Sequence, residues 1–184
     1  MYLYRFIFEM LCGTVIFAAL SFALFTASGS HIAKLEKLTR DPRLGLIIAL
    51  PALAACIPHA QIVAPGILQN PAVLWGLAIA IVLLSYFYID YYAARALAGA
   101  VIILAYDLIH YSYEWLLPGM EFMVIMAWLS GFAGIWASGK PHALRDCFRL
   151  AASQRRFAIC SALTALVWSL TYLWALINGA LKIR

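Results

Sequence analysis

Long apolar runs, separated by short polar segments, occupy nearly the whole of the 184-residue chain. A run of about 20 apolar residues is the length that an α-helix needs to cross the hydrocarbon core of a bilayer. The expected spans are 4–26, 44–63, 72–92, 96–117, 121–138 and 157–176. The pattern therefore predicts an all-α integral membrane protein, a six-transmembrane-helix bundle that forms a single transmembrane domain over residues 1–184.

The boundary between the third and fourth spans is the least marked, because the chain is apolar almost continuously from Ala72 to Leu117. Aromatic residues divide this stretch. One group lies at 86–92 and another at 111–115, which is typical of the two membrane interfaces, where Tyr and Trp gather. We expect the turn between these spans at Tyr92–Ala96.

Two polar segments, His31–Arg43 and His142–Arg156, combine basic residues with apolar residues at helical spacing. This pattern predicts two short interfacial amphipathic helices on the cytoplasmic surface. The membrane-surface basic residues of the second segment are Arg145, Arg149, Arg155 and Arg156. Guanidinium groups suit phosphate oxygens and lipid headgroups. The ordinary bias of basic residues toward the cytoplasmic side is nevertheless sufficient to explain them.

The composition agrees with a membrane protein. Hydrophobic residues make up 66% of the chain and charged residues only 11%, whereas soluble domains carry about 25% charged residues. A soluble chain of this length cannot bury so much apolar surface. The net charge of +5 is explained by the membrane orientation, so we expect no nucleic-acid partner.

The distribution of Lys and Arg predicts that orientation. Basic residues follow the first, third and fifth spans, and none lies between the second and third or between the fourth and fifth. Short loops rich in Lys and Arg stay on the cytoplasmic side of a membrane. We therefore expect the chain to be integral to the plasma (inner) membrane with both termini outside.

Three ionisable residues mark the fourth span as the candidate site. Asp107, His110 and Glu114 are spaced i, i+3 and i+7, so on a helix they lie within about 60° of one another. A charged group near the bilayer centre costs roughly 3 kcal/mol on insertion scales. We therefore expect this stripe to face protein or water and not lipid.

Other polar residues fall in the same half of the membrane. On the expected topology, His59 lies at a depth similar to that of His110, and Glu9 lies near the outer end of the first span. The predicted cavity or ion-binding residues are Asp107, His110, Glu114, His59, Glu9 and Tyr106. The sequence thus predicts an outward-facing polar cluster that begins near mid-membrane.

Three interpretations of this cluster stay open. It could form a polar cavity that binds or passes a small solute or cation, with Asp107 as a titrating group. His59, His110 and Asp107 could instead bind a metal ion or a haem, which would make the protein a membrane enzyme. Alternatively, the polar groups could only fix helix packing in a structural or assembly subunit of a larger membrane complex.

Few sequence motifs help to choose between these interpretations. The chain contains no HExxH motif, glycine-rich phosphate loop or nucleophile elbow, which favours a protein that is not an enzyme. The four cysteines occur singly, without the spacing of a metal site. The expected partners are the lipid bilayer and, under the third interpretation, other membrane subunits.

Overall fold

A computed structural model describes residues 2–27, 29–140 and 142–182, and over these residues the chain is all-helical, with eight α-helices, one short 3₁₀ helix and no strand. Six of the described helices are long and apolar enough to cross a membrane, which confirms the predicted fold class. These are α1 (Tyr2–Phe25), α3 (Pro42–Val63), α4 (Pro71–Tyr88), α5 (Tyr92–Glu114), α6 (Met120–Gly139) and α8 (Arg155–Lys182). The shorter helices are α2 (Gly29–Arg40), η1 (Gly66–Gln69) and α7 (Ala143–Ser153).

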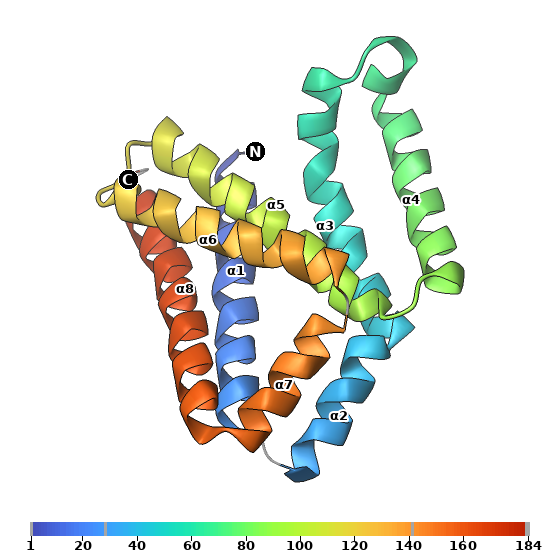
Figure 1. Cartoon of the computed structure of the whole chain (residues 1–184). Coiled ribbons are helices and arrows are strands. Elements are labelled where there is room, and N and C mark those ends of the chain that lie inside the picture. Colours follow the sequence, from blue (N-terminus) through green and yellow to red (C-terminus); the bar gives the residue numbers. More distant parts are fainter. Residues whose placement is uncertain (1, 28, 141, 183–184) are drawn as a thin grey trace.

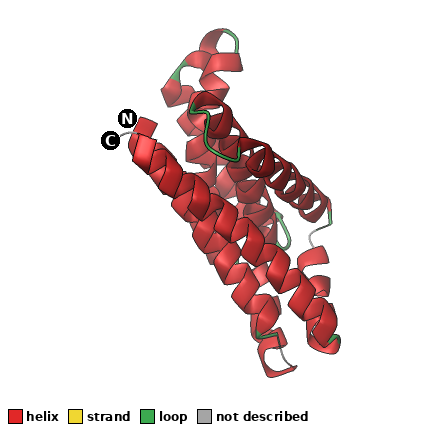
Figure 2. Ribbon diagram, turned by 90° about the vertical axis from the view of Figure 1, so that its left-hand side faces the viewer, coloured by secondary structure: helices red, strands yellow, loops and turns green. Residues whose placement is uncertain are grey.

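Helices α1 and α8 lie antiparallel and side by side, so that the first residues of α1 and the last residues of α8 meet at one end of the molecule (Figures 1 and 2). Small buried residues along α8 allow the close approach. They are Ala158, Ala162, Ala165, Ala175 and Gly179. A Cβ atom on Gly179 would overlap the ring of Phe6. Asn178–Gly179, which looks like a helix end in the sequence, is therefore a packing position, and α8 continues to Lys182.

Helix α5 is the centre of the bundle and packs against α1, α3, α6 and α8. Most of its residues are buried, beginning with Tyr92 and the alanines of its first two turns. The turn before it lies at 89–91, where Tyr91 adopts the left-handed conformation with φ 56° and ψ 40°. The turn that we expected at Tyr92–Ala96 thus lies earlier, because residues 92–96 are helical and all of them except Arg95 are buried.

Helices α3 and α4 form a hairpin through η1 that stands beside the rest of the molecule (Figure 1). Pro51 and Pro58 interrupt the backbone hydrogen bonds of α3. Asn70 caps α4, since its side chain accepts a hydrogen bond from the backbone N–H of Ala72 at 2.9 Å. Within α4 only Val82 is buried, so most of this helix faces the surroundings.

The amphipathic helices α2 and α7 lie next to each other at the end of the molecule opposite η1 (Figure 1). An ion pair joins them, because both Nε and Nη2 of Arg149 donate to the Glu36 carboxylate, at 2.5 and 3.0 Å. Phe148 packs among residues from the ends of α1 and α8, including Leu24 and Ala158. The two basic segments are therefore built into the bundle.

Candidate functional site

Asp107 lies inside the bundle, as its position in the central helix α5 requires. Its side chain is 1% exposed, and within the described parts of the chain neither carboxylate oxygen makes a hydrogen bond. The closest polar atoms are Nε2 of His59 at 3.3 Å and Nη2 of Arg5 at 3.7 Å, both from Oδ1. A buried carboxylate without a hydrogen-bond donor is unusual, because desolvation of a charged group is costly.

Arg5 connects three helices at this point. Its Nε donates to Oε1 of Glu9 on the same helix at 2.6 Å. Its Nη2 donates to the backbone carbonyl of Ala55 in α3 at 3.0 Å and lies 2.7 Å from Nε2 of His59. Because Nη2 carries only two hydrogens, both are used in these contacts. Arg5 thus supplies positive charge near Asp107 but no hydrogen bond to it.

The same contact indicates the state of the His59 ring. A guanidinium group can only donate, so Nε2 of His59 must accept from Arg5, and the ring proton then lies on Nδ1. In this form the imidazole is uncharged and offers Asp107 no hydrogen from Nε2. His59 lies in α3, directly after Pro58. Its ring packs edge-on against that of Tyr106, with the ring centroids 4.9 Å apart.

Each carboxylate oxygen of Glu9 accepts a hydrogen bond, in contrast to those of Asp107. Its Oε1 accepts from Arg5, and its Oε2 accepts from the hydroxyl of Tyr111 at 2.9 Å. Tyr111 is missing from the sequence-based set of site residues, although it lies one helical turn after Asp107 and therefore on the same face. That spacing is the signal that could have identified it.

His110 and Glu114 lie outside this buried group. Their side chains are about half exposed, and Nε2 of His110 lies 3.4 Å from Oε2 of Glu114. The His110 ring stacks against that of Tyr106 and lies 6.3 Å from that of His59, measured between centroids. The predicted cluster is thus divided. Asp107, His59 and Glu9 meet inside with Arg5 and Tyr111, and His110 and Glu114 line the neighbouring exposed face.

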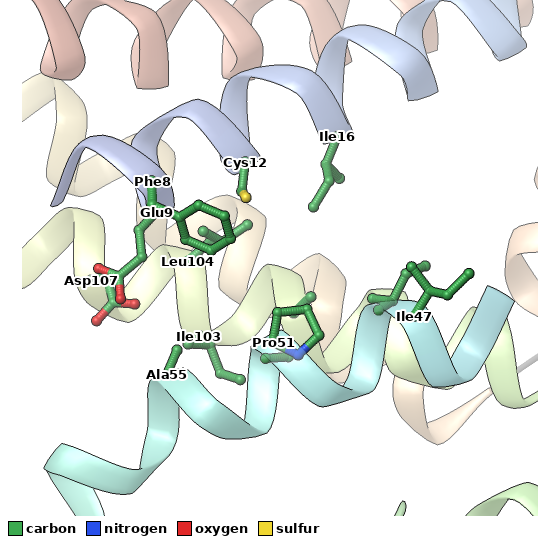
Figure 3. A pocket seen from close by; sticks show the side chains of 13 residues that line it. Phe8, Glu9, Cys12, Ile16, Ile47, Pro51, Ala55, Ile103, Leu104 and Asp107 are labelled. Carbon is green, nitrogen blue, oxygen red and sulfur yellow. The ribbon is translucent and has the colours of Figure 1, made fainter. Parts of the chain in front are cut away.

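A pocket of about 170 Å³ opens beside Glu9 and Asp107, between α1, α3 and α5. Figure 3 shows these two carboxylates next to each other at one end of the pocket, with Ile47 and Ile16 toward the other end. The lining residues are Phe8, Glu9, Cys12, Ile16, Ile47, Ile48, Pro51, Ala52, Ala55, Ala100, Ile103, Leu104 and Asp107. Apart from the two carboxylates, the pocket is therefore lined by apolar side chains and one thiol.

No protein-family model, curated protein or solved structure matches this chain. The site must therefore be interpreted from its own chemistry. One guanidinium group and two carboxylates meet at the end of an apolar pocket, and Asp107 is the carboxylate that the protein leaves without a hydrogen-bond donor. Such an arrangement can accept a proton or the cationic group of a ligand.

The metal interpretation finds no support in the geometry of the described residues. Among them, no three His, Cys, Asp or Glu side chains are grouped so that they could hold a metal ion. Of the three candidates, His59 and Asp107 are neighbours, while His110 lies close to Glu114.

The four predicted basic surface residues differ in their contacts. Arg149 pairs with Glu36, and Arg145 pairs with Asp146 at 2.9 Å. Arg155 donates to the backbone carbonyl of Phe25 at 3.0 Å, and Arg156 is exposed. All four lie at the end of the molecule that carries α2 and α7.

Proposed function

We propose that this protein binds a small organic cation within the membrane, with Asp107 as its counter-ion and the pocket between α1, α3 and α5 as the place for its apolar part. One observation carries the proposal. Asp107 is a carboxylate that is 1% exposed, accepts no hydrogen bond from the described residues and borders an apolar pocket. We infer that the Asp107 end of the site is reached from the outer side of a plasma membrane, and that the protein takes up or exports the cation.

The balance of charge supports a cationic ligand. Arg5 forms its short ion pair with Glu9 at 2.6 Å, and its distance to Asp107 is 3.7 Å. His59 is uncharged in the arrangement described above. The cluster therefore carries one carboxylate more than it has cations, and a buried charge without a partner is strongly unfavourable. A ligand ammonium group at Asp107 would complete the balance.

The size and lining of the pocket indicate what the rest of the ligand resembles. A cavity of about 150 Å³ lined by aliphatic and aromatic side chains binds benzene, and this pocket measures about 170 Å³. An apolar group about as large as one aromatic ring would fit. A polar solute would lose its hydration without finding hydrogen-bond partners there.

The depth of the cluster supports access from the outer side. Arg5 and Glu9 lie in the first half of α1, and His59 lies near the end of α3. Both positions are close to the end of the molecule that carries η1 and the two terminal helix ends, far from α2 and α7 (Figure 1). If α2 and α7 are cytoplasmic, as their basic residues indicate, the cluster lies in the outer half of the membrane.

Calorimetric titration of the purified protein in nanodiscs with phenethylammonium tests this proposal. We expect binding by the wild type, binding weaker by about tenfold or more for Asp107→Asn, and unchanged binding for Glu114→Gln, which removes an exposed carboxylate from the same helix. The uncharged 2-phenylethanol should bind far more weakly than the cation. Equal binding by the wild type and Asp107→Asn would exclude Asp107 as the counter-ion.

A structural role in a larger membrane complex is the second candidate, and α4 is the observation that favours it. This helix is apolar throughout, and Val82 is its one buried residue. A partner helix could cover it as well as lipid can. Size-exclusion chromatography of the chain from its native membrane in mild detergent distinguishes the two, because a subunit should elute with stoichiometric partners and lose them when Leu77 and Leu84 are changed to Ala.

A further inference from the structure

A second polar site lies at the other end of the molecule, around Tyr91. Three connections meet there: the end of α2, the turn between α4 and α5, and the start of α7. Nη2 of Arg40 donates to the Tyr91 hydroxyl at 2.7 Å, and Nη1 of Arg145 donates to the same oxygen at 3.1 Å. Two guanidinium groups thus converge on a single uncharged oxygen atom.

This convergence places like charges close together without a carboxylate between them. Asp146 pairs with Arg145, but within the described ranges no carboxylate lies within ion-pair distance of Arg40. Two positive groups this close repel each other unless an anion joins them. Aromatic stacking offsets part of that repulsion, since the guanidinium carbons of Arg40 and Arg145 lie 4.8 and 6.0 Å from the centroid of the Tyr91 ring.

Tyr91 is itself held in a conformation suited to this arrangement. Its φ of 56° and ψ of 40° are left-handed, which non-glycine residues rarely adopt. The hydroxyl oxygen of Tyr91 accepts from both arginines, so the hydroxyl hydrogen is not used in these two contacts. It can donate to an anion that lies beside the two guanidinium groups. The site therefore presents two charged donors and one neutral donor to the same region.

The surroundings have room for an anionic group and a positive field to attract it. A polar pocket of about 440 Å³ adjoins Arg40 and Tyr91 and is lined by Arg40, Pro42, Ile89, Asp90, Tyr91 and the aromatic residues 86–88. Arg145 lies beside this pocket, on the Tyr91 hydroxyl, and is not part of its lining. Asp90 is the one carboxylate in that lining. The pKa of Glu36 is held below its usual value, chiefly by its hydrogen bond from Arg149 and further by the charges of Arg149, Arg145 and Arg40.

We propose that Arg40, Arg145 and the Tyr91 hydroxyl bind a phosphate group, such as the headgroup of an anionic phospholipid. Two guanidinium groups match the oxygens of a phosphate in charge and geometry. The site lies where helices of the bundle end among aromatic side chains, which is the depth at which lipid headgroups are found. This site is separate from the Asp107 cluster and does not depend on the function proposed for it.

Thermophoresis of the purified full-length protein in detergent tests this assignment with dihexanoyl phosphatidic acid. Dihexanoylglycerol, which has the same chains and no phosphate, is the matched ligand control. We expect the double variant Arg40→Gln/Arg145→Gln to weaken phosphatidic acid binding by about tenfold or more. The double variant Lys34→Gln/Lys37→Gln removes the same charge from exposed positions on α2 and should leave binding within about threefold of the wild type.

Equal weakening by the two double variants would overturn the proposal, because it would indicate a diffuse charge effect. Equal binding of dihexanoylglycerol and phosphatidic acid would also overturn it. If the Gln variant does not fold, Arg40→Lys/Arg145→Lys keeps the charge, and loss of binding by that variant would support recognition by the guanidinium fork. Competition by inorganic phosphate would indicate a site open to the free ion, whereas phosphatidic acid binding without competition would indicate the lipid headgroup.

Discussion

Arg5 is the positively charged residue that lies among the polar groups of α1, α3 and α5 in the buried cluster. Its Nε holds Glu9, and its Nη2 is occupied by the Ala55 carbonyl and the His59 ring. The Ala55 carbonyl lies next to the one that Pro58 leaves without a helical donor, in a part of α3 where the backbone hydrogen bonds are interrupted. Asp107 lies 3.7 Å from the guanidinium group and accepts no hydrogen bond from it, which is why we propose Asp107 as the counter-ion.

Asp107→Asn should therefore keep the fold while it removes the proposed counter-ion. The substitution breaks no hydrogen bond between described residues and removes a buried charge. We expect the free energy of unfolding to rise by about 1 kcal/mol. For a chain of this size, this corresponds to a rise in Tm of about 2–4 °C. Thermal unfolding in detergent measures the change. A fall in Tm would show that the carboxylate is stabilised by contacts with its surroundings.

Tyr111→Phe should have the opposite effect on stability. It removes the hydroxyl that donates to Oε2 of Glu9 at 2.9 Å and leaves a buried carboxylate oxygen without a donor. The expected cost is about 1–3 kcal/mol, measured as the free energy of unfolding in denaturant. Tyr113→Phe removes a hydroxyl from a side chain that is 58% exposed, and it should change the stability little.

Close packing between helices determines how the helices are arranged in the bundle. Helices α5 and α6 form one of the most extensive interfaces, and Gly134 of α6 is buried in it. A Cβ atom at Gly134 would lie 2.9 Å from Cγ1 of Ile102 and 3.0 Å from the backbone oxygen of Ala98. The second of these contacts is with backbone, which cannot move aside as a flexible side chain can. The two helices must separate to accept a methyl group there.

Gly134→Ala should destabilise the protein by about 1–3 kcal/mol, since a helix interface has to shift. Gly99 lies inside α5 with nothing within 4 Å of the position of a Cβ atom. Gly99→Ala should be neutral or stabilising by up to about 1 kcal/mol, because alanine favours helix. Comparing the two denaturation midpoints separates packing from helix propensity, and a tolerated Gly134→Ala would contradict the close approach of α5 and α6.

The sequence predicts the spans well because length and apolar content decide whether a helix can cross a bilayer. It does not predict which spans are central. Helices α4 and α5 are both long apolar runs, yet α4 is largely exposed and α5 largely buried. A run that is apolar all round carries little information about its neighbours. For the same reason the partnership of α1 with α8, and the continuation of α8 past Gly179, become evident only in three dimensions.

The candidate site was predictable in part, and the reason lies in helix geometry. Asp107, His59 and Glu9 come together because polar groups in spans avoid lipid. His110 lies on the edge of the buried face of α5, whereas Tyr111, at i+4 from Asp107, points inward. Arg5 was not included because an arginine at the start of a span resembles an interfacial anchor. Besides Glu9 on the same helix, its contacts are with Ala55 and His59 on α3, about 50 residues away in sequence.

At the scale of the whole molecule, the pair of α2 and α7 ties the N-terminal part of the chain to the C-terminal part. Hydrogen bonding from Arg149 lowers the pKa of Glu36, and the positive charges of Arg149, Arg145 and Arg40 add to this effect. A carboxylate with a lowered pKa adds stability above its ordinary value, here 4.5, and that contribution is lost as the pH falls through the lowered value. The contact is therefore acid-sensitive.

Glu36→Gln should accordingly lower the Tm at pH 7, and the difference from the wild type should disappear as the pH falls below 4.5. Thermal unfolding between pH 7 and pH 3 gives both curves. Asp90→Asn removes an exposed carboxylate at the same end of the molecule and should change the Tm at pH 7 little. A Tm difference for Glu36→Gln that persists at pH 3 would assign the effect to packing.

The two ends of the molecule differ in chemistry, and our expectation for the orientation of the chain in the membrane rests on that difference. The η1 end carries Gln69 in an exposed uncharged turn, whereas Gln154 is exposed between α7 and α8 among arginines. Basic residues stay on the cytoplasmic side. In a background with Cys12, Cys56, Cys147 and Cys160 replaced by Ala, we expect a membrane-impermeant maleimide to label Gln69→Cys in intact cells. Gln154→Cys should be labelled only after permeabilisation, and the reverse result would place the Asp107 pocket in the cytoplasmic half of the membrane.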